Sequence, residues 1–74
     1  MAYKYDKLIG RIIEKFGNRK AFAAAMHMTG ESLSKKLNNH RCFDQREITL
    51  ACDLLEIADS EVSVYFFTLE VQSA

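Results

Sequence analysis

Basic side chains are concentrated in the middle of this 74-residue sequence, although its formal net charge is zero. Residues 15–46 contain seven Lys and Arg against two acidic residues, whereas residues 47–74 contain six Asp and Glu and no Lys or Arg. Clustered ammonium and guanidinium groups attract phosphate, so the basic segment favours a nucleic-acid partner. The acidic segment would then face away from the phosphates.

Four side chains could ligate a metal or react as nucleophiles: His27, His40, Cys42 and Cys52. None has the C-x-x-C or H-x-x-x-H spacing of a zinc site. The two cysteines could form one disulfide, but in a cytosolic chain reduced thiols are favoured. Because the histidines have no nucleophile partner and no glycine-rich phosphate loop occurs, we expect no metal, no cofactor and no enzymatic activity.

The elements that must position these residues are helices. Proline is absent and only three glycines occur, which suits short helices joined by tight turns. Apolar spacing and capping residues predict a compact all-α domain of five helices covering residues 1–74. The first helix ends at Gly17 and buries an apolar face made of Leu8, Ile9, Ile12, Ile13 and Phe16. The second helix covers Arg19 to Met26, and the third runs from about Gly30 to Asn38. The fourth helix follows Asp44, and the last follows Asp59 or Ser60.

Residues that suit an N-cap precede four of these helices, and Asp59 or Ser60 is expected to cap the last one. Asn18 precedes the second helix and Thr29 the third. Asp44, with Glu47 three residues later, predicts a capping box at the start of the fourth helix. The asparagines at 38–39 are expected to end the third helix, because asparagine tolerates the left-handed conformation.

Residues 18–38 have the pattern of a helix-turn-helix. Apolar residues stand at fixed offsets on both sides of a three-residue turn: Phe22, Ala23 and Met26 before it, and Met28, Leu33 and Leu37 within and after it. The small Ala23 lets the two helices cross closely, and Met28 fills the gap between them. The outer face of the third helix is then free to enter the major groove of DNA.

The string F-A-x-x-M-x-M-T-x-x-S-L-S-x-x-L-N-N, over residues 22–39, resembles the lambda-repressor-like class of helix-turn-helix proteins. The whole chain, with its opening Tyr-Asp-Lys-Leu-Ile-Gly at 5–10 and its closing Val-Tyr-Phe-Phe at 64–67, resembles small proteins of temperate bacteriophages identified as Cro-type repressors. His27 departs from the pattern, because the class usually has glycine at this turn position.

The resemblance implies ten DNA-contacting residues: Arg19, Thr29, Gly30, Glu31, Ser32, Ser34, Lys35, Lys36, Asn38 and Arg41. Those at the start of the third helix would face base edges, where Glu31 could accept from cytosine and Lys35 donate to guanine. Thr29 and Arg19, at helix N-termini, would meet phosphate, and Asn38 and Arg41 would grip the backbone. Alternatively, the basic members only form a solvated face.

Two functions follow as expectations. The first is a transcriptional regulator that binds double-stranded operator DNA as a homodimer. The second is a modulator or antirepressor that binds a sister phage repressor and changes its hold on DNA. Gly30 offers no side chain for reading bases and Glu31 repels phosphate, which favours the second, whereas the basic middle favours the first. With no signal peptide and no long apolar run, we expect the protein in the cytoplasm of the bacterial host, away from membranes.

The C-terminal arm, residues 66–74, belongs to a segment with an excess of large apolar side chains. Six occur within eight positions: Val64, Tyr65, Phe66, Phe67, Leu69 and Val71. A chain of this size has little core in which to bury them. The arm could form a short strand, pair with the arm of a second copy, accept a sister repressor, or fold back to complete its own core.

Overall fold

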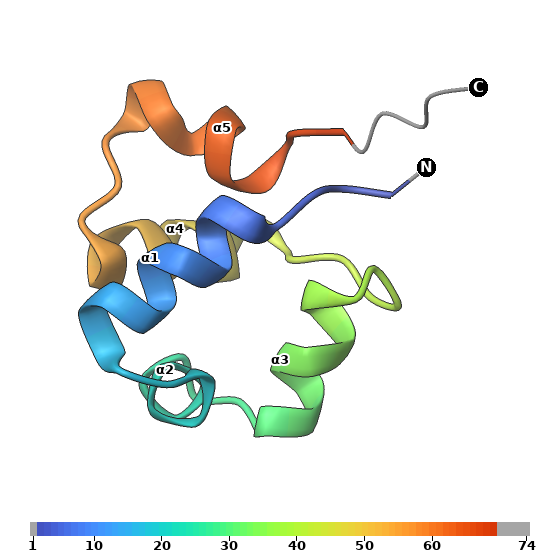
Figure 1. Ribbon diagram of the computed structural model, residues 1–74, viewed down its shortest axis with the longest axis vertical. Coiled ribbons are helices and arrows are strands. Elements are labelled where there is room, and N and C mark those ends of the chain that lie inside the picture. The colour runs from blue at the N-terminus through green and yellow to red at the C-terminus, as the bar shows by residue number, and fades with distance from the viewer. Residues whose placement is uncertain (1, 70–74) are drawn as a thin grey trace.

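The computed structural model describes residues 2–69, and the predicted compact all-α fold with five α-helices is confirmed within them (Figure 1). The elements are α1 (Asp6–Phe16), α2 (Arg19–Ala25), α3 (Gly30–Leu37), α4 (Gln45–Leu55), the 3-10 turn η1 (Asp59–Glu61) and α5 (Val62–Phe66). Helix α1 lies at the centre and packs against α2, α4 and α5. Helices α2 and α3 lie on one side of α1 and α5 on the other (Figure 1).

The N-caps predicted for α2, α3 and α4 form, but the prediction that Asp59 or Ser60 caps the last helix is wrong. Both residues lie within η1, and α5 follows Glu61 with no side-chain cap. The Asn18 side chain accepts a hydrogen bond from the backbone of α2 at 2.8 Å, and the Thr29 hydroxyl accepts one from the backbone of α3 at 3.1 Å. Asp44 and Glu47 make the two reciprocal bonds of a capping box, at 2.8 and 2.9 Å. These bonds satisfy amides that a helix leaves free at its start, so the sequence locates these helix starts correctly.

Within residues 2–69, three non-glycine residues have positive φ angles: His27 (59°), Asn39 (64°) and Glu56 (54°). This conformation costs energy for any residue with a Cβ, and asparagine tolerates it best among the three. His27 therefore has the positive φ expected at the turn position where the helix-turn-helix class usually has glycine. Asn39 follows the end of α3, as predicted. Glu56 ends α4, where an ion pair with Lys15 holds the pKa of its carboxyl below the ordinary value.

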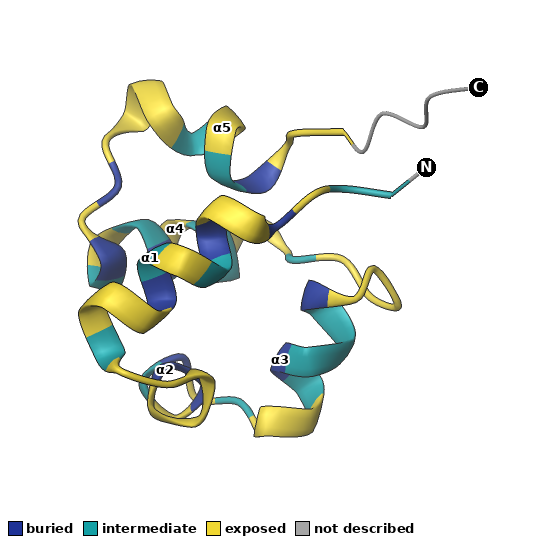
Figure 2. Ribbon diagram, viewed as in Figure 1, coloured by how far each residue is buried: buried dark blue, intermediate teal, exposed yellow. Residues whose placement is uncertain are grey.

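The core lies where α1 meets the other helices (Figure 2). Its buried residues are Tyr5, Leu8, Ile12, Phe22, Ala23, Met26, Leu33, Leu37, Ala51, Leu55, Ile57 and Phe66. They include five of the six residues expected to hold α2 against α3, and the sixth, Met28, is half-buried and packs against the core. The prediction for Ile13 is wrong, because its side chain is 46% exposed. Helix α1 turns Leu8 and Ile12 into the core, and this leaves Ile13 on the outer side of its apolar stripe.

The two ends of the described chain lie side by side (Figure 1). Tyr3 and Leu69 form a single antiparallel bridge, and the Lys4 N–H donates to the Thr68 carbonyl at 2.7 Å. Within residues 66–69, part of the predicted arm is therefore buried and part is not. Phe66 completes the core, whereas Phe67 and Leu69 remain exposed. The remainder of the predicted arm, residues 70–74 with Val71, lies outside the described residues.

Candidate functional site

The outer surface of α2 and α3, here called the α2–α3 surface, carries the residues expected to contact DNA. Arg19 begins α2 and is exposed, and Thr29, Gly30 and Glu31 are exposed at the start of α3. The Thr29 hydroxyl is already used as the cap of α3. The structure thus confirms that the predicted contacts from Gly30 to Lys36 share one helix, and it places Arg19 on the neighbouring helix α2.

The exposed side chains of α3 interact mainly with one another. Lys35 lies 3.4 Å from the Glu31 carboxylate, an ion pair between residues one helical turn apart. The Asn38 side chain donates to the Ser34 hydroxyl at 3.3 Å. Ser32 is half-buried. The Lys35 ammonium group on this face of α3 therefore has an opposite charge beside it, and this reduces the attraction of Lys35 for phosphate.

Lys36 is turned toward the protein and away from the α2–α3 surface. Its ammonium group donates to the Glu47 carboxylate at 2.9 Å and to the Cys42 carbonyl at 3.1 Å, and it lies 5.9 Å from the centre of the Phe43 ring. Only 11% of the side chain is exposed. Lys36 thus ties α3 to the start of α4, a role that sequence reasoning missed because its partner is eleven residues away.

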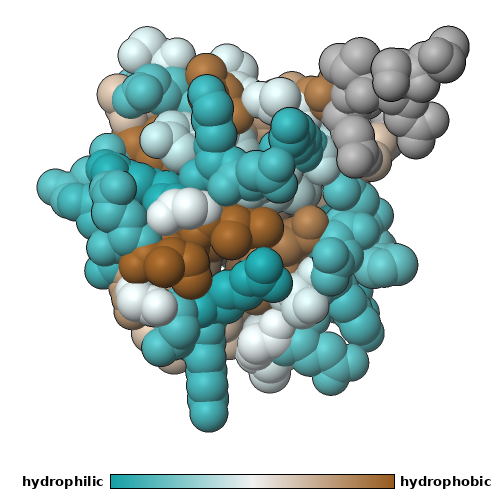
Figure 3. All heavy atoms as spheres, in the orientation of Figure 1, coloured by the Kyte–Doolittle hydropathy of each residue, from teal (hydrophilic) through white to brown (hydrophobic). Residues whose placement is uncertain are grey.

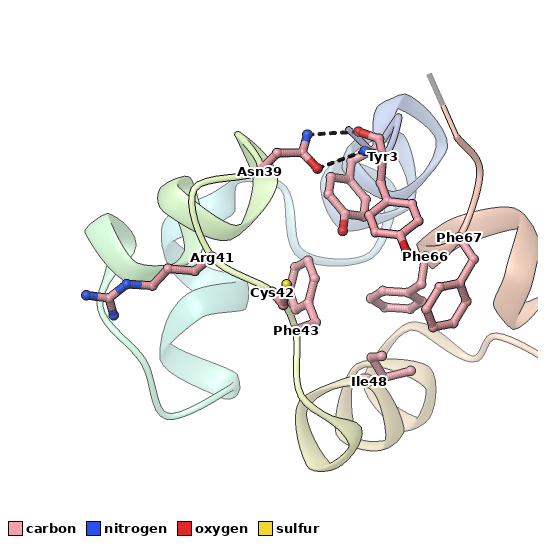
Figure 4. Close-up of a pocket in the computed structure, with 9 residues that line it drawn as sticks. Tyr3, Asn39, Arg41, Cys42, Phe43, Ile48, Phe66 and Phe67 are labelled. Carbon is pink, nitrogen blue, oxygen red and sulfur yellow. Dashed lines mark hydrogen bonds between the residues drawn. The ribbon is translucent and has the colours of Figure 1, made fainter. Parts of the chain in front are cut away.

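Arg41 lies on the loop between α3 and α4, at the rim of a cavity (Figure 4). Its guanidinium group points away from the aromatic side chains of that cavity (Figure 4). The predicted contacts Arg19 and Arg41 are both exposed. As DNA contacts, the ten residues remain predictions.

The cavity, of about 280 Å³, lies between the N-terminal segment, the α3–α4 loop and the end of α5. Its lining is mostly aromatic: Tyr3, Tyr5, Phe43, Phe66 and Phe67, with Ile48, Asn39, Arg41 and Cys42 around them. We call these residues, together with Val64 and Leu69, the aromatic end. Sequence reasoning did not assign Tyr3, Tyr5, Phe43 and Ile48 to a common site, because they come from separate segments and share no local pattern.

The rings of the aromatic end form a continuous chain of contacts. Phe67 meets Tyr3 edge-on with 5.9 Å between ring centres, and Tyr3 lies 6.2 Å from Tyr5. Phe43 then contacts Tyr5 at 5.6 Å and Phe66 at 5.4 Å. Edge-to-face pairs of this kind add stability beyond area burial. Burial raises the pKa of Tyr5, with a further contribution from nearby Cys42, so its phenol stays neutral.

Large apolar side chains remain exposed at this end. Phe67 is 49% and Leu69 44% exposed, and Val64 is exposed as well. The other exposed large apolar residue among those described is Ile13 on α1. Figure 3 shows hydrophobic residues gathered near the middle of the molecule, with hydrophilic residues on both sides. Among the described residues, the exposed large apolar side chains therefore lie on α1 and at the aromatic end, and only the aromatic end adjoins the cavity.

In the part of the chain that the structure describes, the possible metal ligands and the two thiols are not grouped into a site. Residues 2–69 contain no group of three His, Cys, Asp or Glu that could hold a metal ion. Cys42 is exposed and Cys52 half-buried, and both are free thiols. Burial and the carboxylates of Asp59 and Asp53 raise the pKa of the Cys52 thiol, which makes it less reactive. No helix among these residues is long and apolar enough to cross a membrane.

A solved structure resembles this chain over nearly its full length. It is the solution structure of the modulator of repression of the temperate bacteriophage TP901-1 from Lactococcus lactis, with 36% identity, a TM-score of 0.80 and coverage of 97% of both chains. The identification as a Cro-type repressor, and with it the interpretation as a DNA-binding transcriptional regulator, is therefore wrong. The helix-turn-helix pattern predicted the fold correctly but not the function, because one fold serves several functions.

Comparison with curated protein sequences gives no match. A family model described as "Protein of unknown function (DUF739)" matches residues 1–69. The match covers nearly all of the chain, including α1–α5 and the aromatic end as far as Leu69. The chain therefore belongs to the DUF739 family of proteins of unknown function.

Proposed function

We propose that this protein is a modulator of repression in a temperate bacteriophage, and that it acts by binding a phage repressor protein. The observation that carries the proposal is the 36% identity, over 97% of both chains, to a phage modulator of repression. The proposed activity is binding alone, so we assign no catalytic residue, metal or cofactor. It would take place in the cytoplasm of the bacterial host, where a repressor meets its operator.

The aromatic end is the surface that best supports this function. Protein interfaces are enriched in aromatic side chains at their centres, and the energy of binding is concentrated in a few of them. Phe67 and Leu69 are each about half exposed beside a cavity with aromatic walls. They can bury further area against a repressor without any rearrangement of the core.

The pairing of the two α3 lysines within the chain also fits a protein partner. Lys35 is paired with Glu31, and Lys36 is held by Glu47 and the Cys42 carbonyl. These lysines would have to leave existing partners to bind phosphate, which weakens the electrostatic term that dominates DNA affinity.

The test uses the repressor encoded beside the gene of this chain. Calorimetric titration of that repressor with the purified protein should show saturable binding, and a mobility-shift assay should show that the protein changes repressor binding to operator DNA. The protein alone should not shift the same DNA at concentrations that saturate the repressor. Absence of repressor binding, together with a specific shift by the protein alone, would overturn the proposal.

A second copy of this chain is the competing occupant of the aromatic end, as the expected homodimer would require. Sedimentation of the protein alone tests this alternative. A dimer that dissociates when the repressor is added would mean that the two partners share the surface.

A further inference from the structure

Asn39 joins two segments of the aromatic end that are 36 residues apart. The Tyr3 N–H donates to Asn39 Oδ1 at 2.8 Å, and Asn39 Nδ2 donates to the Tyr3 carbonyl at 2.9 Å (Figure 4). The side-chain amide thus satisfies both backbone groups of one residue, as a neighbouring strand would. Tyr3 is thereby fixed between Asn39 on one side and its bridge to Leu69 on the other.

Asparagine meets two requirements at this position together. The φ angle of 64° favours glycine or asparagine. The pair of bonds to Tyr3 needs one donor and one acceptor on a short side chain, which the amide provides and a carboxylate does not. Glycine would keep the backbone conformation but lose both bonds. Aspartate would keep the acceptor and place a negative charge beside the Tyr3 carbonyl.

The two hydrogen bonds between Asn39 and Tyr3, here called the bracket, also determine the shape of the protein surface. Tyr3 forms one wall of the cavity, and its ring meets the exposed Phe67 edge-on at 5.9 Å. We infer that Asn39 is a positioning residue for repressor binding: it holds Tyr3 so that Tyr3 and Phe67 present one preformed surface. This inference rests on the proposed function and adds to it a residue that contacts no partner itself. A preformed surface loses less conformational freedom on binding, so the bracket raises affinity.

The experiment compares Asn39→Gly and Asn39→Asp with Asn38→Ala. Asn38 is the adjacent asparagine, has a negative φ of −98° and donates from its side chain only to Ser34, so it is a matched control. Asn39→Gly loses both hydrogen bonds, whereas Asn39→Asp loses the donated one and places a negative charge beside the Tyr3 carbonyl. Each variant should therefore bind the repressor about tenfold more weakly. Asn38→Ala removes a hydrogen bond within the α3 region and none at the aromatic end. Its repressor affinity should stay within about twofold of that of the unmodified protein.

A second readout needs no repressor. In the free protein, nuclear Overhauser contacts between the Tyr3 and Phe67 rings, and slow exchange of the Tyr3 amide, should be lost in both Asn39 variants and kept in Asn38→Ala. Lowering the pH through about 4, where a carboxyl group is protonated, should restore the ring contact in Asn39→Asp, because the introduced group then regains a donor. A role of Asn39 that depended only on its backbone conformation would not produce this rescue.

The two readouts separate the inference from the proposed function. If the unmodified protein does not bind the repressor, the proposed function fails, and the ring contacts still decide whether Asn39 positions Tyr3. If Asn39→Gly and Asn39→Asp keep the ring contacts, or lose them with unchanged repressor affinity, Asn39 is not a positioning residue for this surface.

Discussion

The α2–α3 surface and the aromatic end use their exposed side chains in opposite ways. On the α2–α3 surface, polar groups pair within the chain: Thr29 caps α3, Lys35 meets Glu31, and Asn38 bonds to Ser34. At the aromatic end, Phe67 and Leu69 remain about half exposed beside an aromatic cavity. The polar side chains of α3 are thus largely engaged within the chain, while Arg19 on α2 stays exposed. The aromatic end leaves an apolar surface available.

This difference shows how a fold and a function can separate. The α2–α3 arrangement depends on buried residues such as Phe22, Ala23 and Leu33, which set the crossing of the two helices. Those residues predict a helix-turn-helix whatever the outer face does. Binding depends on the exposed residues, and here the exposed apolar ones lie at the other end of the molecule.

The largest effect is expected from the double substitution Phe67→Ser with Leu69→Ser. Repressor affinity should fall about a hundredfold, because a central aromatic residue of an interface contributes roughly 2–4 kcal/mol. The free energy of unfolding should fall by roughly 1–2 kcal/mol, because each side chain is about half buried and Phe67 also loses its edge-to-face contact with Tyr3. Calorimetric titration with the repressor and a thermal melt of the free protein measure the two quantities.

Ile13→Ser is the matched control for this prediction. Ile13 is 46% exposed, like the residues of the aromatic end, but it lies on α1. Its substitution should leave repressor affinity within about twofold, since a peripheral residue contributes little to binding. A larger loss from Ile13→Ser than from the double substitution would place the binding surface on α1 and reverse the comparison.

Signals that act over a few residues made much of the fold predictable. Asn18, Thr29 and the Asp44–Glu47 capping box each bond to the helix that follows them. Asn39 was expected to adopt the left-handed conformation that it has. Caps and turns depend on residues three or four positions apart, so they can be recognised in a sequence.

The aromatic end could not be predicted in this way. It brings together Tyr3, the loop with Phe43, and Phe67, segments that no periodicity relates. The roles of Lys35 and Lys36 were likewise indistinguishable in the sequence. Adjacent residues on a helix point about 100° apart, so one lysine faces Glu31 on its own helix and the other faces Glu47 on α4.

Replacing Lys35 and Lys36 one at a time tests the comparison through the free energy of unfolding. Lys36→Ala should lower the free energy of unfolding by roughly 2 kcal/mol, because it leaves the half-buried Glu47 carboxylate without its cation. Lys35→Ala should cost less than about 0.5 kcal/mol, as expected for an exposed pair within one helix. Urea unfolding measures both. Equal costs would mean that Lys36 is not held against α4, and the internal pairing of this region would lose its main support.

A smaller effect than that of Lys36→Ala is expected at the turn between α2 and α3. His27 has a φ of 59°, where a side chain with a Cβ is disfavoured. Glycine removes that strain but gives the unfolded chain more freedom, so His27→Gly should raise the free energy of unfolding by only about 0.5–1 kcal/mol. Ala24→Gly, on the exposed side of the adjacent α2, is the control and should lower it by about 1 kcal/mol. Repressor affinity should stay unchanged in both variants, because the turn is remote from the aromatic end. If His27→Gly stabilises the turn and also strengthens repressor binding, the α2–α3 surface takes part in recognition and the division between the two regions is incomplete.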